Sequence, residues 1–525
     1  MIEPDRNIVL TGFMGVGKTV VARAVAQALD RPLIDTDMEI VSRTGKDIPD
    51  IFREDGEEAF REHERAICQD LAGRRGLVIA TGGGTLVDDA NRQTLGLSGV
   101  LVCLDCEPAE LLQRLAGDEG RPMLWGKDPS ARLQRLLAAR QPAYARIPHH
   151  IDTTYRSPEQ IAQDVIALYR TEPVSWDVRT PTGSYPVRLV PGGLEMVGTL
   201  LDAHGVGPNV AIVSDEHVWP LHGERLRRGM DKERGPARPL MLPAGEQHKT
   251  LDTLHLMYDR FAEDRLDRSG AVIALGGGVI TDMAGLAAAT FMRGVRFVPI
   301  PTTLLGMVDA SIGGKVAVDH PRGKNLIGAF VEPLFVLLDP EVLATLPEAE
   351  RRAGLAEIIK AGVIGDAELF AALEARDDPP LRWVVERAIQ VKVNIVEEDP
   401  YESGRRAVLN LGHTFAHAFE LLSGYRMAHG LAVGRGMAAA AHLAELRGLC
   451  TEHTRRRIVA VLQRRDLPTA YAEHQPSDVY EAMWADKKRR GSSLRFVLPR
   501  AIGDVTVDGE VPKEQVLRAL ERIRP

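Results

Sequence analysis

The sequence predicts an α/β protein in two successive parts. The first is a parallel sheet with helices on both faces, and the second has an α/β half followed by a mainly helical half. Short apolar runs without polar alternation, such as residues 77–80 and 100–104, are typical of strands buried on both faces of a parallel sheet. Two glycine-rich turns, Gly12–Gly17 and Gly276–Gly278, each follow a run of this kind. From about residue 343 the strand-like runs give way to Ala- and Leu-rich helical patterns.

Length and composition limit the function classes that fit this chain. Its 525 residues exceed what one hydrophobic core usually holds, and 44% apolar with 26% charged residues is the balance of a globular protein. The formal net charge of −8 argues against nucleic acid as the main partner, and no uncharged apolar run reaches 18 residues. Only four cysteines occur, and we interpret the Cys103/Cys106 pair as structural. We therefore expect a reduced, cytoplasmic protein that binds neither nucleic acid nor membrane.

In the first part, strands are expected at residues 7–11, 32–35, 77–80 and 100–104, with a helix from the first turn to about residue 29. An amphipathic stretch over 157–170 predicts a closing helix. A Pro-containing segment, 171–177, then breaks the pattern and predicts a domain boundary.

In the second part, strands are expected at 187–190, 210–214, 271–275 and 296–300. One short β-like segment, 494–498, follows the helical region. We therefore divide the chain into residues 1–171, 172–340 and 341–525.

The first glycine-rich turn predicts a site for ATP and Mg²⁺. The segment from Gly12 through Gly15 and Gly17 to Lys18 and Thr19 fits the pattern G-x-x-x-x-G-K-[ST], after a strand and at the start of a helix. In such a loop, backbone N–H groups surround phosphate oxygens. The lysine supplies a positive charge to the β- and γ-phosphates, and the threonine hydroxyl ligates the metal.

Residues around this loop narrow the choice of phosphate acceptor. Asp35 and Asp37 follow the second strand, Arg61 and Glu64 share a helix face, and the triplet Gly82–Gly84 ends the third strand. With Arg121 in a polar loop and Arg140 after a basic helix, this series resembles shikimate kinase over residues 5–170. The competing assignment is an adenylate-type or gluconate-type kinase. Neither of these kinases would need Asp37, Arg61, the glycine triplet and Arg140 together.

The resemblance to shikimate kinase implies roles for individual residues. Shikimate would be held by Asp37, Arg61, Gly83 and Arg140, with Asp37 as the candidate base. Asp35 would reach Mg²⁺ through water, Arg121 would close over the transferred phosphoryl group, and Arg114 would flank the adenine.

The second glycine turn is weaker evidence for a nucleotide, because Gly276–Gly278 is not a G-x-G-x-x-G fingerprint. The sequence segments around it are more specific. They include residues 243–249, 301–305, 309–315, 323–325, 354–360, 406–417, 429–430 and 486–488. Together they resemble 3-dehydroquinate synthase across residues 185–505.

That family converts 3-deoxy-arabino-heptulosonate 7-phosphate to 3-dehydroquinate and phosphate, with bound NAD and a divalent metal, zinc or cobalt. By resemblance, NAD would contact Asp215, Glu246, Lys249, Gly277, Gly278, Val279, Asp282, Thr302, Thr303 and Lys324. The phosphate and carboxylate of the substrate would be bound by Arg293, Lys315, Lys324, Asn325, Lys392, Arg406, Asn410 and one of Lys487 and Lys488. Among these, Lys315 and Arg406 are also candidate catalytic residues.

The metal ligands have two possible assignments. His413 and His417 lie four residues apart, so spacing alone proposes them as a zinc pair on one helix face. The resemblance instead gives Glu357, His413 and His429 as ligands and leaves His417 for the substrate phosphate, where it is also a candidate catalytic residue. We adopt the second assignment.

The chain departs from the family pattern at two positions, because Glu332 stands where Gln is expected and Leu431 replaces an acidic residue. Two other interpretations remain open. One half could be a non-catalytic scaffold, or the second part could be a metal-dependent polyol or alcohol dehydrogenase. The resemblance also implies a homodimer formed through the synthase.

Overall fold

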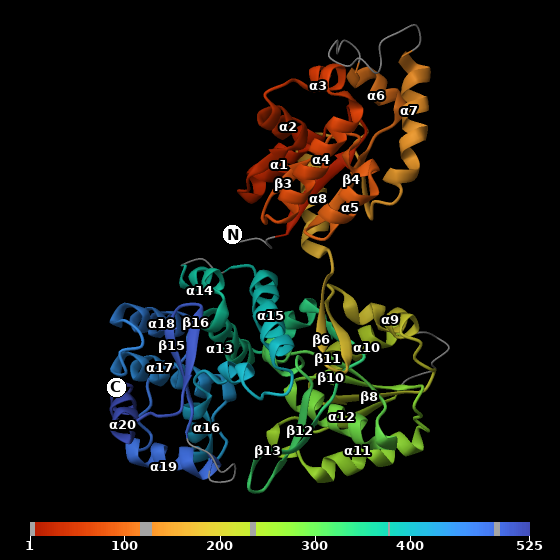
Figure 1. Ribbon diagram of the computed structural model, residues 1–525. Helices are drawn as coiled ribbons and strands as arrows, with labels where there is room; N and C mark the ends of the chain where they lie inside the picture. The colour runs from red at the N-terminus through yellow and green to blue at the C-terminus, as the bar shows by residue number, and fades with distance from the viewer. Residues whose placement is uncertain (1–5, 116–128, 231–237, 376–378, 488–493) are drawn as a thin grey trace. The chain divides into compact units, whose positions relative to one another are not determined.

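The computed structural model describes residues 6–115, 129–230, 238–375, 379–487 and 494–525, without the side chains of 129–130 and 485–487. It divides into two compact units, one extending to Glu172 and the other beginning at Pro173 (Figure 1). No helix in these ranges is both long and apolar enough to span a membrane.

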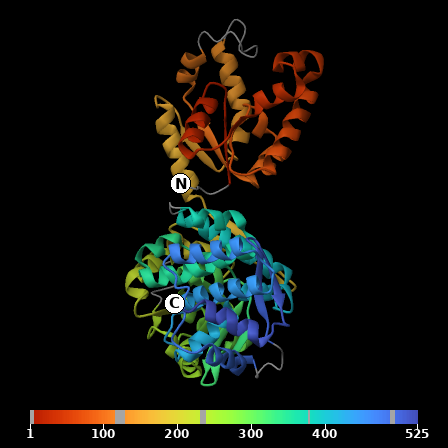
Figure 2. The same ribbon diagram turned by 90° about the vertical axis from the view of Figure 1, so that its left-hand side faces the viewer.

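The first unit is built on a five-stranded parallel sheet in the order β2-β3-β1-β4-β5. Helices cover both faces of this sheet (Figures 1 and 2). The strands are β1 (Asn7–Gly12), β2 (Leu33–Asp35), β3 (Val78–Ala80), β4 (Gly99–Asp105) and β5 (His149–Asp152). The helices are α1 (Lys18–Leu29), α2 (Thr36–Thr44), α3 (Ile48–Glu54), α4 (Gly56–Ala72), α5 (Asp89–Gly96), α6 (Pro108–Leu115), α7 (Pro129–Tyr144) and α8 (Pro158–Thr171), with a 3₁₀ turn η1 (Thr85–Val87).

This arrangement confirms the parallel sheet predicted for the first part. Every residue of β1 and β3 is buried, which explains their apolar runs. β5 was not predicted, because it lies at the sheet edge and begins with two histidines. The closing helix α8 has a capping box, in which the Ser157 side chain accepts from the Gln160 backbone and the Gln160 side chain accepts from the Ser157 backbone.

The second unit begins with an α/β half. Its main sheet is parallel, in the order β11-β10-β8-β9, with β8 (Val210–Asp215), β9 (Pro239–Leu242), β10 (Ala271–Gly276) and β11 (Arg296–Pro301). A second sheet has the order β14-β7-β6, with β6 (Val174–Thr180), β7 (Gly183–Leu189) and β14 (Val336–Leu338). A hairpin pairs β12 (Lys315–His320) with β13 (Gly323–Phe330). The helices are α9 (Val197–Ala203), α10 (Trp219–Gly229), α11 (Leu251–Glu263) and α12 (Gly278–Thr290), with short turns η3 (Gly193–Met196), η5 (Glu246–His248), η6 (Phe291–Arg293), η7 (Gly306–Ala310) and η8 (Pro340–Thr345).

A mainly helical half follows, as the sequence predicts. It contains α13 (Glu348–Gly365), α14 (Ala367–Glu374), α15 (Leu381–Glu398), the turn η9 (Arg405–Asn410), α16 (His413–Leu422), α17 (His429–Leu446), α18 (Glu452–Arg464), α19 (Pro476–Lys487) and α20 (Lys513–Arg522). The β-like segment near residue 494 is an antiparallel pair of β15 (Phe496–Ala501) and β16 (Asp504–Asp508).

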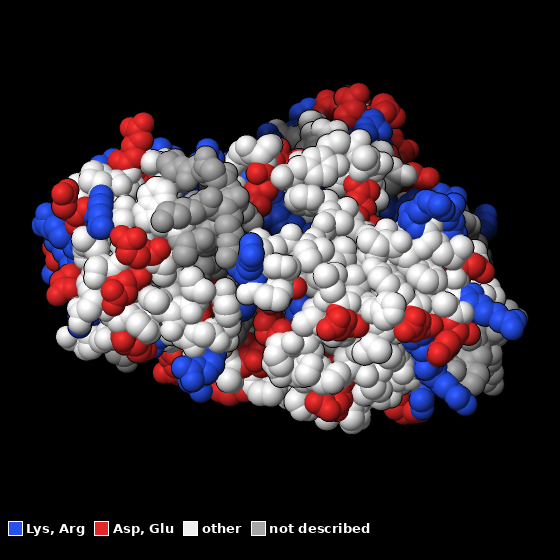
Figure 3. Space-filling view, turned by 90° about the horizontal axis from the view of Figure 1, so that it is seen from below, with Lys and Arg blue, Asp and Glu red and all other residues white. Residues whose placement is uncertain are grey.

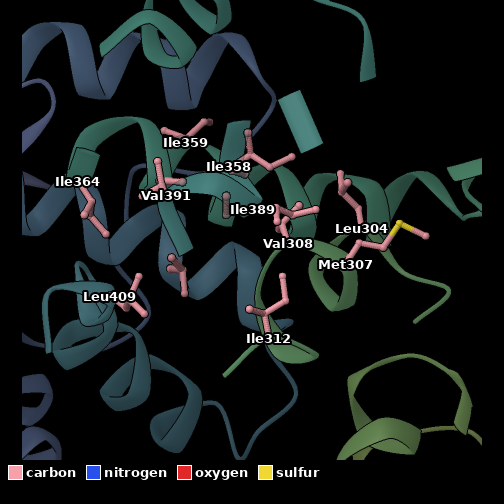
Figure 4. Packing of buried hydrophobic residues seen from close by; sticks show 14 of the residues in the cluster. Leu304, Met307, Val308, Ile312, Ile358, Ile359, Ile364, Ile389, Val391 and Leu409 are labelled. Atoms are coloured by element: carbon pink, nitrogen blue, oxygen red, sulfur yellow. The ribbon is translucent and has the colours of Figure 1, made fainter. Parts of the chain in front are cut away.

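The two halves of the second unit share one hydrophobic core. Leu304, Met307 and Val308, in and just before η7, belong to the same buried cluster as Ile358 of α13 and Ile389 of α15 (Figure 4). Because this packing joins η7 to α13 and α15, polar side chains on these three elements are held at fixed positions relative to one another.

Candidate active sites

The glycine-rich loop of the first unit has the backbone geometry of a phosphate site. Gly12, Gly15 and Gly17 have φ values of 133°, 85° and 96°, which favour glycine. A side chain at Gly12 would come within 2.3 Å of the Leu104 carbonyl oxygen, so the close approach of β1 to β4 requires glycine. Gly17 caps α1, and the N-terminus of a helix attracts anions. Lys18 Nζ donates to the carbonyls of Gly12 and Phe13, both at 3.0 Å.

Thr19 and Asp35 lie side by side next to this loop. Thr19 Oγ1 donates to Asp35 Oδ2 at 2.8 Å. Asp35 Oδ1 accepts from the backbone N–H of Asp37 at 3.1 Å and of Met38 at 3.4 Å, which fixes the carboxylate at the start of α2. An aligned hydroxyl and carboxylate are oxygen groups that suit Mg²⁺ and its water shell.

The predicted acceptor residues converge on the backbone of Gly82–Gly84. A side chain at the first glycine would come within 2.5 Å of Asp37 Oδ1, and one at the third within 2.9 Å of Arg61 Nη1. Arg140 Nη1 donates to the carbonyl of Gly83 at 3.1 Å. Two guanidinium groups and one carboxylate thus surround a backbone that leaves room for a small ligand, and such guanidinium groups can bind a carboxylate.

Two supporting residues were missed as functional residues. Glu64, 2% exposed, accepts from Arg61 Nη1 at 2.5 Å and from Thr85 Oγ1 at 2.6 Å. Burial would lower the pKa of Arg61, but its bond to Glu64 raises it, so the guanidinium stays charged. Tyr144 donates to the Gly83 carbonyl at 2.6 Å. In the sequence, the i, i+3 spacing of Arg61 and Glu64 pointed to the role of Glu64. No comparable spacing pointed to the role of Tyr144.

Arg114 is held on α6 by bonds to the carbonyl of Thr153, at 2.8 Å, and to its hydroxyl, at 3.3 Å. Arg121 lies outside the described residues. The assignments of Arg114 to adenine and of Arg121 to the transferred phosphoryl group stay predictions.

In the second unit, the glycine triplet forms a strand-to-helix junction. β10 ends at Gly276, Gly277 caps α12, and the helix begins at Gly278 and Val279. A side chain at Gly277 would meet Thr303 Cγ2 at 3.2 Å. This junction presents a helix N-terminus without bulky side chains, which is the geometry that binds a pyrophosphate group.

Several residues expected to bind NAD line this junction. Lys249, 4% exposed, donates to Asp282 Oδ2 and Asn325 Oδ1, both at 2.6 Å. Burial would lower the pKa of Lys249, but the Asp282 carboxylate outweighs it and raises that pKa. Thr302 Oγ1 is buried and makes no hydrogen bond within the described part of the chain. A polar group in that position fits contact with a ligand.

Asp215 and Glu246 have defined partners. Asp215 Oδ1 accepts from the backbone N–H of His217 and Val218, both at 2.9 Å, so this carboxylate organises the turn after β8. Glu246 lies 3.5 Å from Lys324 of the β12–β13 hairpin.

Glu357, His413 and His429 form a candidate metal centre. One side-chain ligand atom of each lies within 4.8 Å of those of the other two. Glu357 Oε1 is 3.9 Å from His413 Nε2 and 3.6 Å from His429 Nε2. One carboxylate and two imidazoles are a ligand set that zinc and cobalt accept, so the residues present fit a divalent metal. His417 is not part of this group, and its ring centroid lies 5.6 Å from that of His413.

Partners on the second ring nitrogen orient both histidines. His413 Nδ1 lies 3.2 Å from the Leu411 carbonyl, and His429 Nδ1 lies 3.4 Å from Glu420 Oε1. These oxygens favour a proton on Nδ1, which leaves Nε2 free to bind a metal. Burial lowers the pKa of His413 to about 3, so this imidazole is neutral. Burial also opposes charge on Glu357, yet Lys360 lowers the pKa of that carboxyl to about 2.

Buried opposite charges surround the metal centre. Asp309, on η7, pairs with Lys392 and lies 3.9 Å from Lys360, which itself pairs with Glu357. Burial would raise the pKa of Asp309, but the two lysines lower it. Burial lowers the pKa of Lys392, and Asp309 opposes that effect. Because buried charges cost free energy unless they are paired, Asp309 and Glu357 offset the cost of burying the two lysines next to the candidate metal centre.

A second group of polar residues is formed by η9, by Glu402 just before it and by the start of β12. Lys315 pairs with Glu402, which also accepts from Asn410 Nδ2 at 2.9 Å. Arg406, 2% exposed, donates from Nη2 to the Gly313 carbonyl at 3.0 Å. The structure therefore places the predicted cation Lys315 at the start of β12, and Arg406 and Asn410 on η9, with Glu402 in contact with both Lys315 and Asn410.

Sequence reasoning assigned no role to Asp309, Lys360, Glu402 or Glu420. The first three lie within or next to the segments that carried the resemblance, and Lys360 stands out as a charge in the apolar stretch 358–364. Their roles became visible only from their partners in space.

For Arg293, Lys487 and Lys488, the role in substrate binding stays a prediction. Arg293 is exposed on η6 with φ 64°, the side chain of Lys487 is not described, and Lys488 lies outside the described residues.

Seen from below, the surface between the helical and α/β halves is hollowed, with acidic and basic side chains along the hollow (Figure 3).

Three family models match successive parts of the chain. The Shikimate kinase model matches residues 14–170, the model of the 3-dehydroquinate synthase N-terminal region matches 239–353, and that of the C-terminal region matches 354–489.

Similar proteins cover the second unit. The 3-dehydroquinate synthase of Synechococcus sp. is 45% identical over 359 residues, which is 66% of this chain and 98% of the relative. The one from Synechocystis sp. is 43% identical over 357 residues, 65% of this chain and 98% of the relative. A solved structure of 2-epi-5-epi-valiolone synthase from Streptomyces hygroscopicus, with NAD⁺ and Zn²⁺ bound, is 32% identical with a TM-score of 0.60. It aligns with 66% of this chain and 99% of its own.

Proposed function

We infer that this chain, which belongs to the 3-dehydroquinate synthase family and carries a shikimate kinase domain before the synthase, is a bifunctional enzyme of the shikimate pathway. One unit transfers a phosphoryl group from ATP to the 3-hydroxyl of shikimate. The other converts 3-deoxy-arabino-heptulosonate 7-phosphate to 3-dehydroquinate and phosphate, with no net redox change. We assign residues 1–171 to the kinase, 172–340 to the NAD-binding half and 341–525 to the helical half of the synthase.

In the kinase, the residues divide between the two substrates. Lys18 neutralises the phosphate oxygens of ATP, and Thr19 and Asp35 hold Mg²⁺ and its water. Arg61 and Arg140 bind the shikimate carboxylate, and Asp37, beside Gly82, accepts the proton of the reacting hydroxyl. The support for this assignment is the convergence of these side chains on Gly82–Gly84.

In the synthase, the junction of β10 and α12 holds the pyrophosphate of NAD, which supplies a reversible hydride acceptor. Glu357, His413 and His429 hold zinc or cobalt, which supplies a Lewis acid for the substrate alcohol. The substrate phosphate and carboxylate bind to Lys315, Lys392, Arg406, Asn410 and His417. We propose the same role for Arg293, Asn325 and one of Lys487 and Lys488.

We also propose that the enzyme is a cytoplasmic homodimer that assembles through its synthase unit. The resemblance to a family that is usually dimeric supports the homodimer. The free state of all four cysteines supports a reducing compartment. Sedimentation of the full chain and of the isolated synthase unit tests the oligomer.

The observation that carries the synthase assignment is a buried metal ligand set beside paired lysines in a chain that also has a glycine-capped nucleotide helix. The purified full chain should release phosphate from the heptulosonate phosphate without accumulating NADH. It should also form ADP when given ATP and shikimate. A metal-dependent dehydrogenase would accumulate NADH instead, and a silent half would lack one of the two products.

A further inference from the structure

Glu420 is a buried acid next to the metal centre that the assignments above leave without a role. It lies on α16 and is 2% exposed. Its Oε1 atom is 3.4 Å from His429 Nδ1 and 3.5 Å from Lys324 Nζ. Burying a carboxylate costs free energy unless it is paired. His429 and Lys324 are the partners that offset this cost for Glu420.

The bond to Glu420 matters more to His429 than a similar bond would matter to His413. His413 is only 11% exposed as a side chain and its Nδ1 has a backbone partner, the Leu411 carbonyl. His429 is the first residue of α17, and its side chain is 34% exposed. Since packing restrains His429 less, the direction of its ring depends on the partners of its two nitrogens.

Lys324 extends the contact across the unit. It lies on β13 in the α/β half, 3.5 Å from Glu246 and 5.1 Å from the ring centroid of Tyr425. Glu420 therefore connects His429 of the candidate metal centre, in the helical half, to a hairpin of the half that carries the nucleotide junction.

We propose that Glu420 is a positioning residue of the synthase: it holds the Nδ1 proton of His429, so that Nε2 faces the metal, and it pairs with Lys324 of the hairpin. The proposal rests on the metal ligands assigned under Proposed function. A carboxylate behind a metal-bound histidine fixes both the tautomer and the direction of the ring, and its loss typically weakens metal binding by about 10–100-fold.

The test measures Co²⁺ binding to the full-length protein, by competition with a chromophoric chelator and by the visible absorption of bound Co²⁺. Glu420→Ala should weaken Co²⁺ binding by about 10–100-fold and change the absorption spectrum. Glu420→Gln keeps an oxygen that accepts from Nδ1–H, so its affinity should fall between that of Glu420→Ala and the parent protein. Glu386→Gln is the matched control, because Glu386 is a buried acid of the helical half that pairs with Arg382 at 2.7 Å. This control should bind Co²⁺ like the parent.

His429→Ala separates this proposal from the metal assignment. If it loses Co²⁺ while both Glu420 variants bind with the parent affinity and spectrum, the role of Glu420 is wrong and the ligand set stands. If His429→Ala also binds normally, the ligand set is wrong and the proposal falls with it. Equal weakening in Glu386→Gln would overturn the proposal too, because loss of any buried acid would then loosen the helical half. Melting temperatures of all variants identify those that fold.

Discussion

The two units build the sites that we propose for substrate phosphate in different ways. In the kinase, one continuous loop from Gly12 to Thr19 forms the site, and Lys18 is held by two backbone carbonyls of that same loop. In the synthase, the charged residues come from η7, α13, α15 and η9, and side chains hold one another, as Asp309 does with Lys392.

This difference separates a site defined by backbone conformation from one defined by charge balance. The loop of the kinase needs glycines at positive φ, and its lysine donates to two backbone carbonyls. In the synthase, burial works against the charged forms, because it lowers the pKa of Lys392 and Arg406 while nearby acids oppose the effect. Removing one member of a buried set leaves an unpaired charge, which is strongly destabilising.

The largest expected effect tests whether the two sites are independent. Lys18→Ala should reduce kinase activity by about 1,000-fold or more, because it removes a fixed positive charge from the phosphoryl group in transfer. Synthase activity should stay within about twofold. ADP formation and phosphate release from the same preparation measure both. A similar fall in the two activities would show that the sites are coupled.

A pair of histidine variants sharpens the synthase side of the comparison. His429→Ala should lose bound zinc or cobalt on dialysis, and synthase activity should fall with it by about 100-fold or more. His417→Ala should keep its metal but bind the phosphorylated substrate poorly. Metal analysis beside steady-state kinetics distinguishes them, with kinase activity as the control. A metal-free His417→Ala beside a metal-replete His429→Ala would restore the assignment based on helix spacing.

The same contrast explains how much could be predicted from the sequence. The P-loop was predictable because its residues are consecutive and follow a strand. The parallel sheets were predictable because strands such as β1 and β10 are buried throughout. Spacing alone proposes His413 and His417 as a metal pair, because i, i+4 neighbours share a helix face, whereas the group that the structure brings together includes His429 from another helix. Only the resemblance gave Glu357 and His429.

The remaining features depend on tertiary structure. Glu420 and Asp309 carry no local signal of their partners, because the lysines that they approach lie on other elements. Strands β6, β12 and β13 were missed because they alternate or carry polar residues, which obscures the pattern of a buried strand.

A smaller effect is expected from the acids that hold Arg61 in the kinase. Glu64→Gln should raise the KM for shikimate by about tenfold, because a buried pair that directs Arg61 at the substrate loses its charge. Glu57 also lies near Arg61, at 3.2 Å, but it is 68% exposed, so Glu57→Gln should change KM by less than about twofold. Initial rates over a range of shikimate concentrations give both values. Equal shifts would mean that the burial of Glu64 is unimportant.

The smallest effect is expected from separating the units between Glu172 and Pro173. Residues 1–172 keep two bonds that secure the end of the kinase, because Glu172 accepts from Arg6 at 3.4 Å and pairs with His149 at 2.7 Å. Residues 173–525 keep β6, which pairs with β7 and meets α15 where Trp176 Nε1 donates to Gln390 at 3.0 Å. Since no buried hydrophobic cluster spans both units in the described part of the chain, each fragment retains its core.

Each fragment should therefore keep its activity within about twofold of the full chain. The control is a synthase fragment of residues 181–525, which lacks β6 and loses the contacts of Trp176 and of Arg179, whose N–H donates to Glu397 at 2.9 Å. Its melting temperature should fall below that of 173–525, because the apolar surface that β6 covers on α15 becomes exposed. Activity assays and thermal melts of the three fragments decide the matter. If the fragment 1–172 or the fragment 173–525 is inactive while the full chain works, each active site depends on the other unit. The local loop of the kinase and the distributed charges of the synthase would then not belong to independent domains.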